Sequence, residues 1–559
     1  MPSPLVECVP NFSEGRDQKV IQAIAAAITA VEGVTLLDVD PGASTNRTVV
    51  TFVGPPEPVV DAAVRAGKAA AEHIDMRRHH GAHPRFGAMD VCPFVPVRDI
   101  TMEEVADLAR EAGRRLGEAG HTIFLYERAA GAEHRSNLAD LRAGEYEGLA
   151  EKLRDPGWAP DFGPSEFQPR TGATAVGARE FLVAYNVNLN TTSTRRANAV
   201  AFDVRERGRV KRTGDPLTGE IVRGPDGEPQ YEPGALQGVK GIGWYIEEYG
   251  VCQVSMNLTD ISVTPIHAAF EAVAESAASR GMRATGSEIV GMVPLRAMLE
   301  AGRYYLARQQ RSLGVPDEEI VRIAIRSMGL DEFGPFDPRE RIIEWRLEEA
   351  GDRLVDLTVS GFTHAVASET PAPGGGSVAA LAGALGAALG TMVANLSAHK
   401  RGWDDRWEEF SDWAVRGKDL HDRLLTLVDE DTAAFDVLMA AMRAARGSDD
   451  PAAQEAVEAA TRGAIEVPLR VMEASQDAME VIATMAAEGL GTSVSDAGVG
   501  ALLARAGVRG AYLNVKINAT GLADATARDE YLARAEEIAV RAATREDEIL
   551  EVVEGRLGE

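Results

Sequence analysis

Three histidines, His79, His80 and His83, fall within five residues and form the densest polar group in the chain. Imidazoles bind metal ions, but Gly81 and Pro84 interrupt any helix that would place two of these histidines on one face. No Cys-x-x-Cys or His-Glu-x-x-His pattern accompanies them. A metal site, an exposed loop and an acid/base imidazole with a pKa of about 6.5 are the three interpretations, and we favour the acid/base group.

Three consecutive acidic residues, Asp429, Glu430 and Asp431, form a second candidate group. Like charges in one short stretch are typical of a solvated helix face. The small and apolar residues at 433–435 support an alternative in which one carboxyl group is buried. Burial would raise the pKa of that carboxyl group and let it donate a proton to a leaving group.

The glycines at 374–376 and Ser377 open a long apolar helix. Glycines allow close approach to the backbone, and a helix N-terminus binds anions. This pattern is weak alone, but it indicates a place where a carboxylate of a ligand would bind.

The elements that must position these groups differ along the chain. Between residues 5 and 125, and again between 181 and 279, apolar residues recur with strand spacing in some segments and helical spacing in others. This pattern predicts two α+β halves, each with one sheet and one helical layer. Residues 214–234 are rich in glycine, proline and charge, which predicts an exposed excursion.

A change of composition between 334 and 352 marks the end of the α+β part. Residues 354–559 have helical character, with breaks at 371–376, 447–451 and 489–495, as in an antiparallel helical bundle. We therefore place the two α+β halves at 1–182 and 183–345, a linker at 346–353 and the helical domain at 354–559.

Length and charge limit the possible functions. The 559 residues suffice for roughly three or four domains. The 45% of hydrophobic and 26% of charged residues are typical of a globular protein. Acidic residues outnumber basic ones 86 to 58, so the net charge of -28 argues against nucleic-acid binding, while a small anionic ligand remains compatible with it.

The three cysteines, Cys8, Cys92 and Cys252, are far apart in the sequence, which is typical of a reducing compartment. Residues 1–11 lack the basic start and apolar stretch of a secretory signal. We therefore expect a cytoplasmic protein.

Residues 377–396 carry no charge and contain Gly386 and Gly390, the small-residue spacing of membrane helix pairs. Most of these residues are Ala, Gly, Ser or Thr, which gain little free energy from lipid. We favour the central helix of a soluble bundle over a membrane span.

Several separate motifs resemble the formiminotransferase-cyclodeaminase family in matching order. In the first part they lie at 7–15, 44–48, 81–85, 90–94, 241–245 and 286–291. In the second part they lie at 373–379, 427–435 and 510–515. The resemblance is specific and covers nearly the whole chain.

The resemblance implies an α+β transferase module of two ferredoxin-like subdomains, followed by an all-α up-and-down helical bundle. In this family the first domain moves the formimino group of N-formimino-L-glutamate to N5 of tetrahydrofolate. The second domain closes the product to 5,10-methenyltetrahydrofolate and releases ammonia. Tetrahydrofolate, with or without a polyglutamate tail, is thus the implied cosubstrate, and no metal is implied.

The family's transferase histidine matches His83, and its deaminase carboxylate matches Asp431. A histidine that titrates near neutrality can take the proton of the attacking amine and return it to the leaving nitrogen. Asp40, at the end of a predicted strand, is our candidate for orienting that histidine. Arg47 is our candidate for binding a substrate carboxylate, with a surface ion pair as an equal alternative.

The resemblance also implies contacts with folate at 163–172 and 240–245. The expected residues are Gly163, Phe167, Arg170, Gly172, Lys240, Gly243 and Trp244 in the first part and Gly374, Gly375, Gly376, Ser377, Asn514 and Lys516 in the second. For Trp244, an ordinary core aromatic is an equal alternative. The 214–234 excursion looks longer than the family usually carries, so the limit of the second folate segment stays open.

Three other functions remain as alternatives. The transferase module would pass formyl groups, the bundle would act as a methenyltetrahydrofolate cyclohydrolase, or the chain would be a non-catalytic folate carrier. Because active sites between bundle helices are often shared across subunits, we expect a homo-oligomer through the helical domain, with no nucleic-acid or membrane partner.

Overall fold

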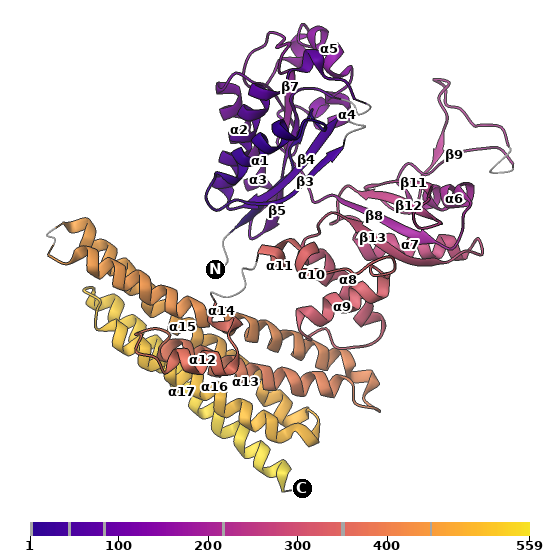
Figure 1. Ribbon diagram of the computed structural model, residues 1–559. Coiled ribbons are helices and arrows are strands. Elements are labelled where there is room, and N and C mark those ends of the chain that lie inside the picture. Colours follow the sequence, from indigo (N-terminus) through magenta and orange to yellow (C-terminus); the bar gives the residue numbers. More distant parts are fainter. Residues whose placement is uncertain are drawn as a thin grey trace. The chain divides into compact units, whose positions relative to one another are not determined.

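The computed structural model describes residues 4–42, 46–81, 85–214, 219–347, 353–447 and 450–558. The chain divides into two compact units, Met1–Pro294 and Leu295–Glu559, which are treated separately below (Figure 1). The first unit is α+β and the second is helical, so the predicted fold class is confirmed.

The first half of the α+β unit is ferredoxin-like. Its elements follow in the order β1 (Leu5–Cys8), α1 (Gln18–Thr29), β3 (Thr35–Gly42), β4 (Arg47–Gly54), α2 (Pro56–His73) and β5 (Met89–Arg98). The antiparallel strands lie in the order β3-β4-β1-β5, and the two-residue strand β2 (Asn11–Phe12) lies between β4 and β5. The topology thus matches the one implied by the resemblance.

Two more strands extend this sheet beyond β5. The helix α3 (Met102–Glu118) leads to β6 (Thr122–Glu127), and the last strand, β7 (Ala173–Ala178), inserts between β5 and β6, parallel to both. Between β6 and β7 lie the short helices α4 (Leu138–Leu141) and α5 (Glu145–Lys152).

The second half repeats the ferredoxin-like order. It contains β8 (Val183–Leu189), α6 (Thr194–Val204), β11 (Val239–Ile246), β12 (Val251–Leu258), α7 (Ile266–Ala278) and β13 (Ala284–Val290). The antiparallel sheet has the order β11-β12-β8-β13. The side chains of Tyr185, Val187 and Val254 point to the face that α6 and α7 cover and are fully buried.

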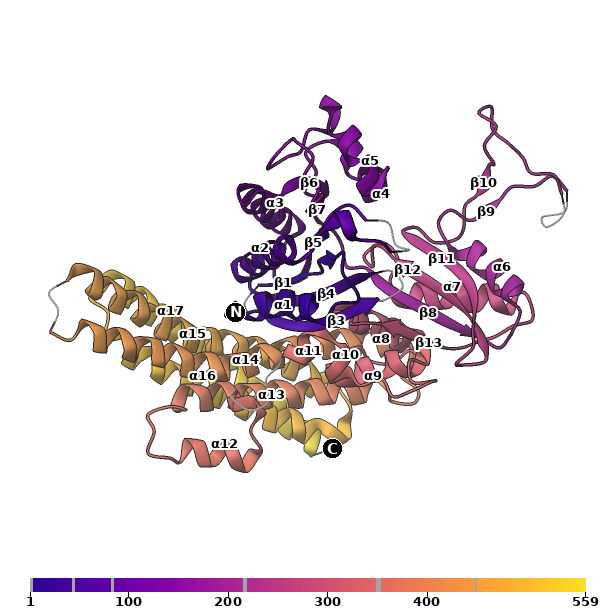
Figure 2. The same ribbon diagram turned by 45° about the horizontal axis from the view of Figure 1, so that its top comes forward.

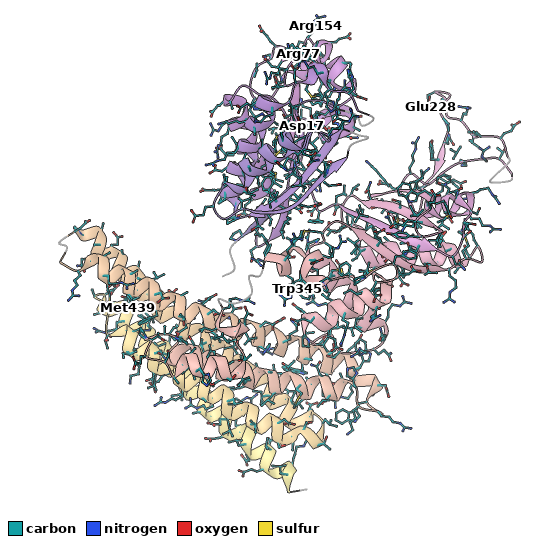
Figure 3. All side chains as sticks on the ribbon, viewed as in Figure 1. Asp17, Arg77, Arg154, Glu228, Trp345 and Met439 are labelled. Carbon is teal, nitrogen blue, oxygen red and sulfur yellow. The ribbon has the colours of Figure 1, made fainter. Side chains whose placement is uncertain are left out.

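The predicted excursion forms an arm with the short strands β9 (Arg209–Val210) and β10 (Tyr231–Glu232). Figure 2 shows it extending away from α6, and Glu228 marks its outer part in Figure 3. None of the residues that the structure describes between 211 and 234 is buried. Residues 215–218 lie outside the described residues.

Five long helices form the up-and-down bundle of the second unit. They are α13 (Gly375–Ala398), α14 (Trp407–Ala445), α15 (Pro451–Glu488), α16 (Val494–Ala519) and α17 (Ala525–Leu557). The predicted breaks coincide with the ends of these helices. Before them come α8 (Leu295–Arg308), α9 (Asp317–Met328), α10 (Pro338–Arg341), α11 (Ile343–Leu347) and α12 (Val359–Val366).

The uncharged helix α13 is long and apolar enough to cross a membrane by length and composition, and 61% of its most apolar window is buried in the fold. Its glycines touch other helices: a Cβ atom on Gly386 would lie 2.7 Å from the Ala504 nitrogen of α16, and one on Gly390 would lie 2.9 Å from Cγ1 of Ile482 in α15. The small residues of α13 thus serve close helix packing inside the bundle.

The helices α8 to α11 belong to the same compact unit as the bundle, although we placed them before the linker at 346–353. Residues 348–352 of that linker lie outside the described residues. The domain limits given above stay a prediction.

Candidate active sites

The histidine segment is anchored on both sides of residues 82–84, which include His83 and lie outside the described residues. On the first side, the buried His79 donates a hydrogen bond from Nε2 to the backbone oxygen of Asn46 at 2.7 Å. Asn46 in turn donates to the backbone oxygen of His80 at 3.0 Å and accepts from the Gly15 nitrogen at 3.0 Å. Burial lowers the pKa of His79, so this imidazole stays neutral and acts as a fixed clamp.

On the other side, a buried carboxylate holds the segment. Asp90 of β5 is fully buried and accepts a hydrogen bond from the Phe86 nitrogen at 2.7 Å. The same carboxylate forms an ion pair with Arg47 of β4 and lies 3.5 Å from Nη2 of Arg142. Arg47 also donates from Nε to Asn11 at 3.0 Å. The ion pair of Arg47 is therefore buried and belongs to the framework of the candidate site.

A different carboxylate, that of Asp40, was predicted from the sequence to orient His83. Asp40 lies exposed on β3, opposite Val49 of β4. Its role beside His83 stays a prediction, because His83 itself is outside the described residues. Asp90 was missed, although a single acidic residue inside an otherwise apolar strand is a usable signal.

The first predicted folate segment, 163–172, lies against this cluster. Gly172 and Gly87 form an antiparallel bridge, and Phe167 packs on Tyr146 with ring centroids 5.5 Å apart. The Arg170 guanidinium donates to the backbone oxygens of Ala71 and Glu72. Gly163 and Gly172 have positive φ angles of 81° and 65°, which explains the glycines without any ligand.

The second predicted folate segment is β11, an edge strand of the second sheet. Trp244 is 47% exposed, so it is not a core aromatic residue. Lys240 and Trp244 point to the face of the sheet opposite the helices, as their alternation with Gly243 requires. Gly243 instead packs on α6, where Asn198 hydrogen-bonds both its nitrogen and its oxygen. A Cβ atom at Gly243 would collide with the backbone of Ala197.

The face of this sheet opposite α6 and α7 carries polar residues that were not predicted from the sequence. One row across the four strands consists of Ile242, Ser255, Asn186 and Glu288. In the next row, Gln253 donates to Asn188 at 2.8 Å, and both side chains are buried. The signal was present, because asparagine alternates with apolar residues in β8.

In the helical unit, Asp431 of α14 lies on the first turn of α13. Its Oδ2 accepts a hydrogen bond from Ser377 Oγ at 3.2 Å. A Cβ atom at Gly376 would collide with this carboxylate, so a glycine is required there. The predicted anion position at this helix N-terminus is thus taken by a carboxyl group of the protein itself. Burial raises the pKa of Asp431, although the hydrogen bonds from Ser377 act in the opposite direction.

The two acidic neighbours of Asp431 have other partners. Asp429 accepts a hydrogen bond from the Leu354 nitrogen at 2.6 Å, and burial raises its pKa. Glu430 forms an ion pair with Arg470 of α15. The three acidic residues therefore do not form one solvated face, and Asp431 alone faces the glycines of α13.

The other predicted residues of the helical unit divide into two groups. A Cβ atom at Gly375 would lie 3.5 Å from Nδ2 of Asn514, so α16 contributes to the same site. Lys516 is exposed, and its Nζ lies 5.3 Å from the centroid of the Tyr512 ring. The structure thus brings Gly375, Gly376, Ser377, Asp431 and Asn514 together.

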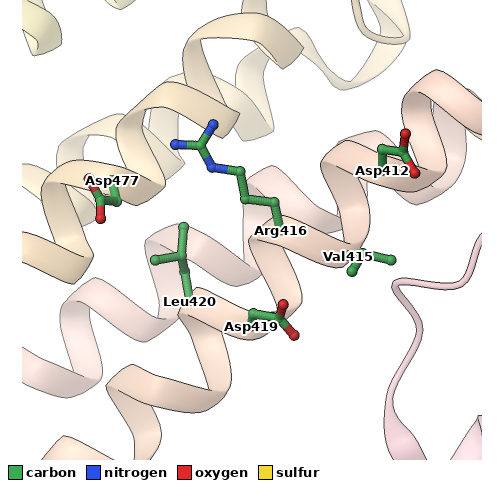
Figure 4. A pocket seen from close by; sticks show the side chains of 6 residues that line it. All are labelled: Asp412, Val415, Arg416, Asp419, Leu420 and Asp477. Carbon is green, nitrogen blue, oxygen red and sulfur yellow. The ribbon is translucent and has the colours of Figure 1, made fainter.

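A cavity of about 330 Å³ lies elsewhere, between α14 and α15 (Figure 4). It is lined by Asp412, Val415, Arg416, Asp419, Leu420 and Asp477. It contains none of the predicted site residues. Among the described residues, no group of three His, Cys, Asp or Glu side chains could hold a metal ion.

We expect the Asp90→Asn substitution to lower the free energy of unfolding by about 3–5 kcal/mol, because it leaves the guanidinium of Arg47 buried without its counter-charge. Urea denaturation followed by circular dichroism measures the change. The matched control is Asp107→Asn, which removes an exposed ion pair with Arg110 and should cost less than about 1 kcal/mol. Equal effects of the two substitutions would contradict the buried network.

We expect Asp431→Asn to change how stability depends on pH. The raised pKa means that the folded protein binds the Asp431 proton more tightly than the unfolded chain. Stability of the wild type relative to the variant should therefore fall as pH rises from the ordinary aspartate pKa of about 3.9 through the raised value. Unfolding free energies measured from pH 4 to pH 8 test this. If the unfolding free energies of the wild type and the variant change with pH in parallel, the prediction is wrong. The control is Asp436→Asn, on the exposed face of α14.

Comparison with known proteins divides the chain at a different place from the two compact units, because one match runs past Pro294 and includes α8 to α11. Residues 5–179 match the N-terminal subdomain of the formiminotransferase domain, residues 184–348 match the formiminotransferase domain, and residues 358–537 match a family described as formiminotransferase-cyclodeaminase. The chain is 43% identical over 557 residues to a formimidoyltransferase-cyclodeaminase of Dictyostelium discoideum, with 99% of both chains covered.

The two parts also resemble separate proteins. A glutamate formimidoyltransferase of Streptococcus pyogenes is 41% identical over 303 residues, which are 54% of this chain and 93% of that protein. A methenyltetrahydrofolate cyclohydrolase of Methylorubrum extorquens is 33% identical over 202 residues, which are 36% of this chain and 97% of that protein. From these matches, which together span nearly its full length, the chain belongs to the formiminotransferase-cyclodeaminase family of bifunctional enzymes.

Proposed function

We propose that this chain transfers the formimino group of N-formimino-L-glutamate to N5 of tetrahydrofolate and then cyclises the product to 5,10-methenyltetrahydrofolate, releasing ammonia. The observation that carries the proposal is the position of Asp431, a carboxyl group with a raised pKa on the glycine-lined first turn of α13. Full-length similarity to a formimidoyltransferase-cyclodeaminase supports it.

In the first reaction, N5 of the folate attacks the amidine carbon and a tetrahedral intermediate forms. His83 takes the proton of the attacking nitrogen and returns it to the nitrogen of the leaving glutamate. Hydrogen bonds from Asn46 to the His80 oxygen and from the Phe86 nitrogen to Asp90 hold the described residues on either side of 82–84. Arg47 stays our candidate for binding a substrate carboxylate, although its Nη1 and Nε already contact Asp90 and Asn11.

In the second reaction, the nitrogen that leaves as ammonia must gain a proton. The half-buried Asp431 has a raised pKa, so it keeps its proton to higher pH than an ordinary aspartate and can donate it. After donation, the hydroxyl group of Ser377 and the N-terminus of α13 stabilise the carboxylate that remains. The site thus favours the protonated form of Asp431 before proton transfer and stabilises its carboxylate afterwards.

The face of the second sheet opposite α6 and α7 supports folate binding. Trp244 offers an exposed aromatic surface on which a pterin ring can stack. Asn186 and Glu288 lie in one row on that face and provide amide and carboxylate groups for the polar edge of a pterin. Lys240, on the same face, suits an anionic tail.

The cyclohydrolase alternative keeps some support, because the helical part resembles a methenyltetrahydrofolate cyclohydrolase. Release of ammonia from 5-formiminotetrahydrofolate distinguishes the two reactions. Formyl donors tested beside formimino donors separate the remaining transferase alternative.

We expect His83→Asn to lower the rate of glutamate release, and Asp431→Ala to lower the rate of ammonia release, each by about 10²–10⁴-fold. The rate of the other half-reaction should stay unchanged in each variant. Glutamate, ammonia and methenyl absorbance are followed separately, each half-reaction being started with its own substrate. His80→Asn is the control, because His80 is exposed beside the same segment and contributes its backbone oxygen to the clamp. Unchanged turnover in both catalytic variants would support a non-catalytic folate carrier.

An apolar stripe on α13 and α16 supports the proposal that the helical unit forms a homo-oligomer. The stripe consists of exposed side chains at helical spacing, namely Val378, Leu385 and Leu396 on α13 and Val499, Leu502, Leu513 and Ile517 on α16. Val378 and Leu513 directly follow and precede the site residues Ser377 and Asn514. A second copy bound there would lie beside the deaminase site.

We expect the double substitution Leu385→Glu and Ile517→Glu to dissociate the oligomer, because it buries two charges in an apolar contact. Light scattering after size exclusion measures the mass. Val540→Glu, at an exposed apolar position on α17, should leave the mass unchanged. An unchanged mass in the double variant would place the contact elsewhere.

A further inference from the structure

The loop between α8 and α9 lies directly on the bundle helices α13 and α14. Gly314 marks the closest point: a Cβ atom there would collide with the backbone and side chain of Ala414 in α14. The structure gives Gly314 no positive φ angle, so the glycine is needed for space and not for backbone conformation. A backbone that approaches a helix this closely leaves no room for a solvent layer.

Polar contacts hold the loop on both helices. The Leu313 nitrogen donates to Ser411 Oγ of α14 at 3.0 Å, and Ser411 is buried. Asn395 of α13 donates to the Gly314 oxygen at 3.0 Å. At the start of α9, Asp317 lies 2.9 Å from Nζ of Lys418.

The lysine of that ion pair is largely withdrawn from water. Lys418 is 9% exposed, and Asp422, one turn along α14, is its second partner at 2.6 Å. Burial alone would lower the pKa of Lys418, but the hydrogen bonds and charges of Asp317 and Asp422 raise it above its ordinary value. The ion pair therefore stays charged at neutral pH, and removing the loop would leave part of this charge uncompensated.

This contact joins parts of the chain that match different families. The loop belongs to the match with the formiminotransferase domain at 184–348, and α13 and α14 belong to the match at 358–537. Similar proteins contain one part without the other. In this chain the two parts meet through a glycine, two hydrogen bonds and an ion pair of the buried Lys418 with the half-buried Asp317.

The same two helices carry the candidate deaminase site, at the N-terminus of α13 and in the interior of α14. Along α14, Lys418 and Asp431 are separated by about 20 Å, and along α13, Asn395 and Ser377 are separated by about 27 Å. We propose that the α8–α9 loop is a docking joint that attaches the helical end of the transferase part to the deaminase bundle without help from the connecting peptide.

A cleavable form of the full chain tests the joint. A specific protease site is inserted within residues 348–352, and the folded protein is cut there and analysed by size exclusion. The two pieces should elute together. Gly314→Val, which forces a side chain into Ala414, should weaken their association roughly 5- to 150-fold.

Gly334→Val is the matched control, because a Cβ atom there meets nothing within 4 Å. A second variant, Asn395→Ala with Ser411→Ala, removes both hydrogen bonds from the bundle side and should also weaken association. Circular dichroism and ammonia release confirm that the variants are folded. Separation of the wild-type pieces, or co-elution of the pieces in both the Gly314 and the double variant, would overturn the proposal.

Discussion

Close backbone contact of α13 with its neighbours is the constraint on which the helical unit depends. Gly386 leaves space for α16, and Gly376 leaves space for a carboxylate of α14. Because Gly376 lacks a side chain, Asp431 can lie against the first turn of α13 and become partly buried. The small residues of α13, whose spacing is also found in membrane helix pairs, thus leave the space in which Asp431 lies.

The two candidate sites use buried polar groups in different ways. At Asp431, burial raises the pKa and keeps a proton available for transfer. At Asp90, a buried carboxylate ties β4 and the residue Phe86 together through an ion pair and a hydrogen bond. The first arrangement leaves a carboxyl group that is more readily protonated than an ordinary aspartate, and the second holds a backbone nitrogen and a guanidinium on one buried carboxylate.

Local patterns predicted much of this architecture. Glycine and proline marked the ends of the long helices, and the motif around Asp431 identified the residue that the fold brings to the glycines. The strand β7 was missed, because its residues Ala, Thr, Ala, Val, Gly and Ala are mostly poor strand formers. Its place between β5 and β6 depends on pairing with strands that are distant in the sequence. Asp90 and Asn186 each had a local signal in their strands, but their partners Arg47 and Glu288 come from other strands and depend on long-range register.

The strand order β3-β4-β1-β5 of the first half equals the order β11-β12-β8-β13 of the second. The α+β unit thus uses one topology twice. The first half carries two additional parallel strands and the histidine segment, whereas the second half is a four-stranded sheet with a row of polar residues on one face. This tandem arrangement puts the candidate acid/base segment and the candidate folate-binding face on two separate sheets, so a substitution in one sheet leaves the hydrogen-bond ladder of the other intact.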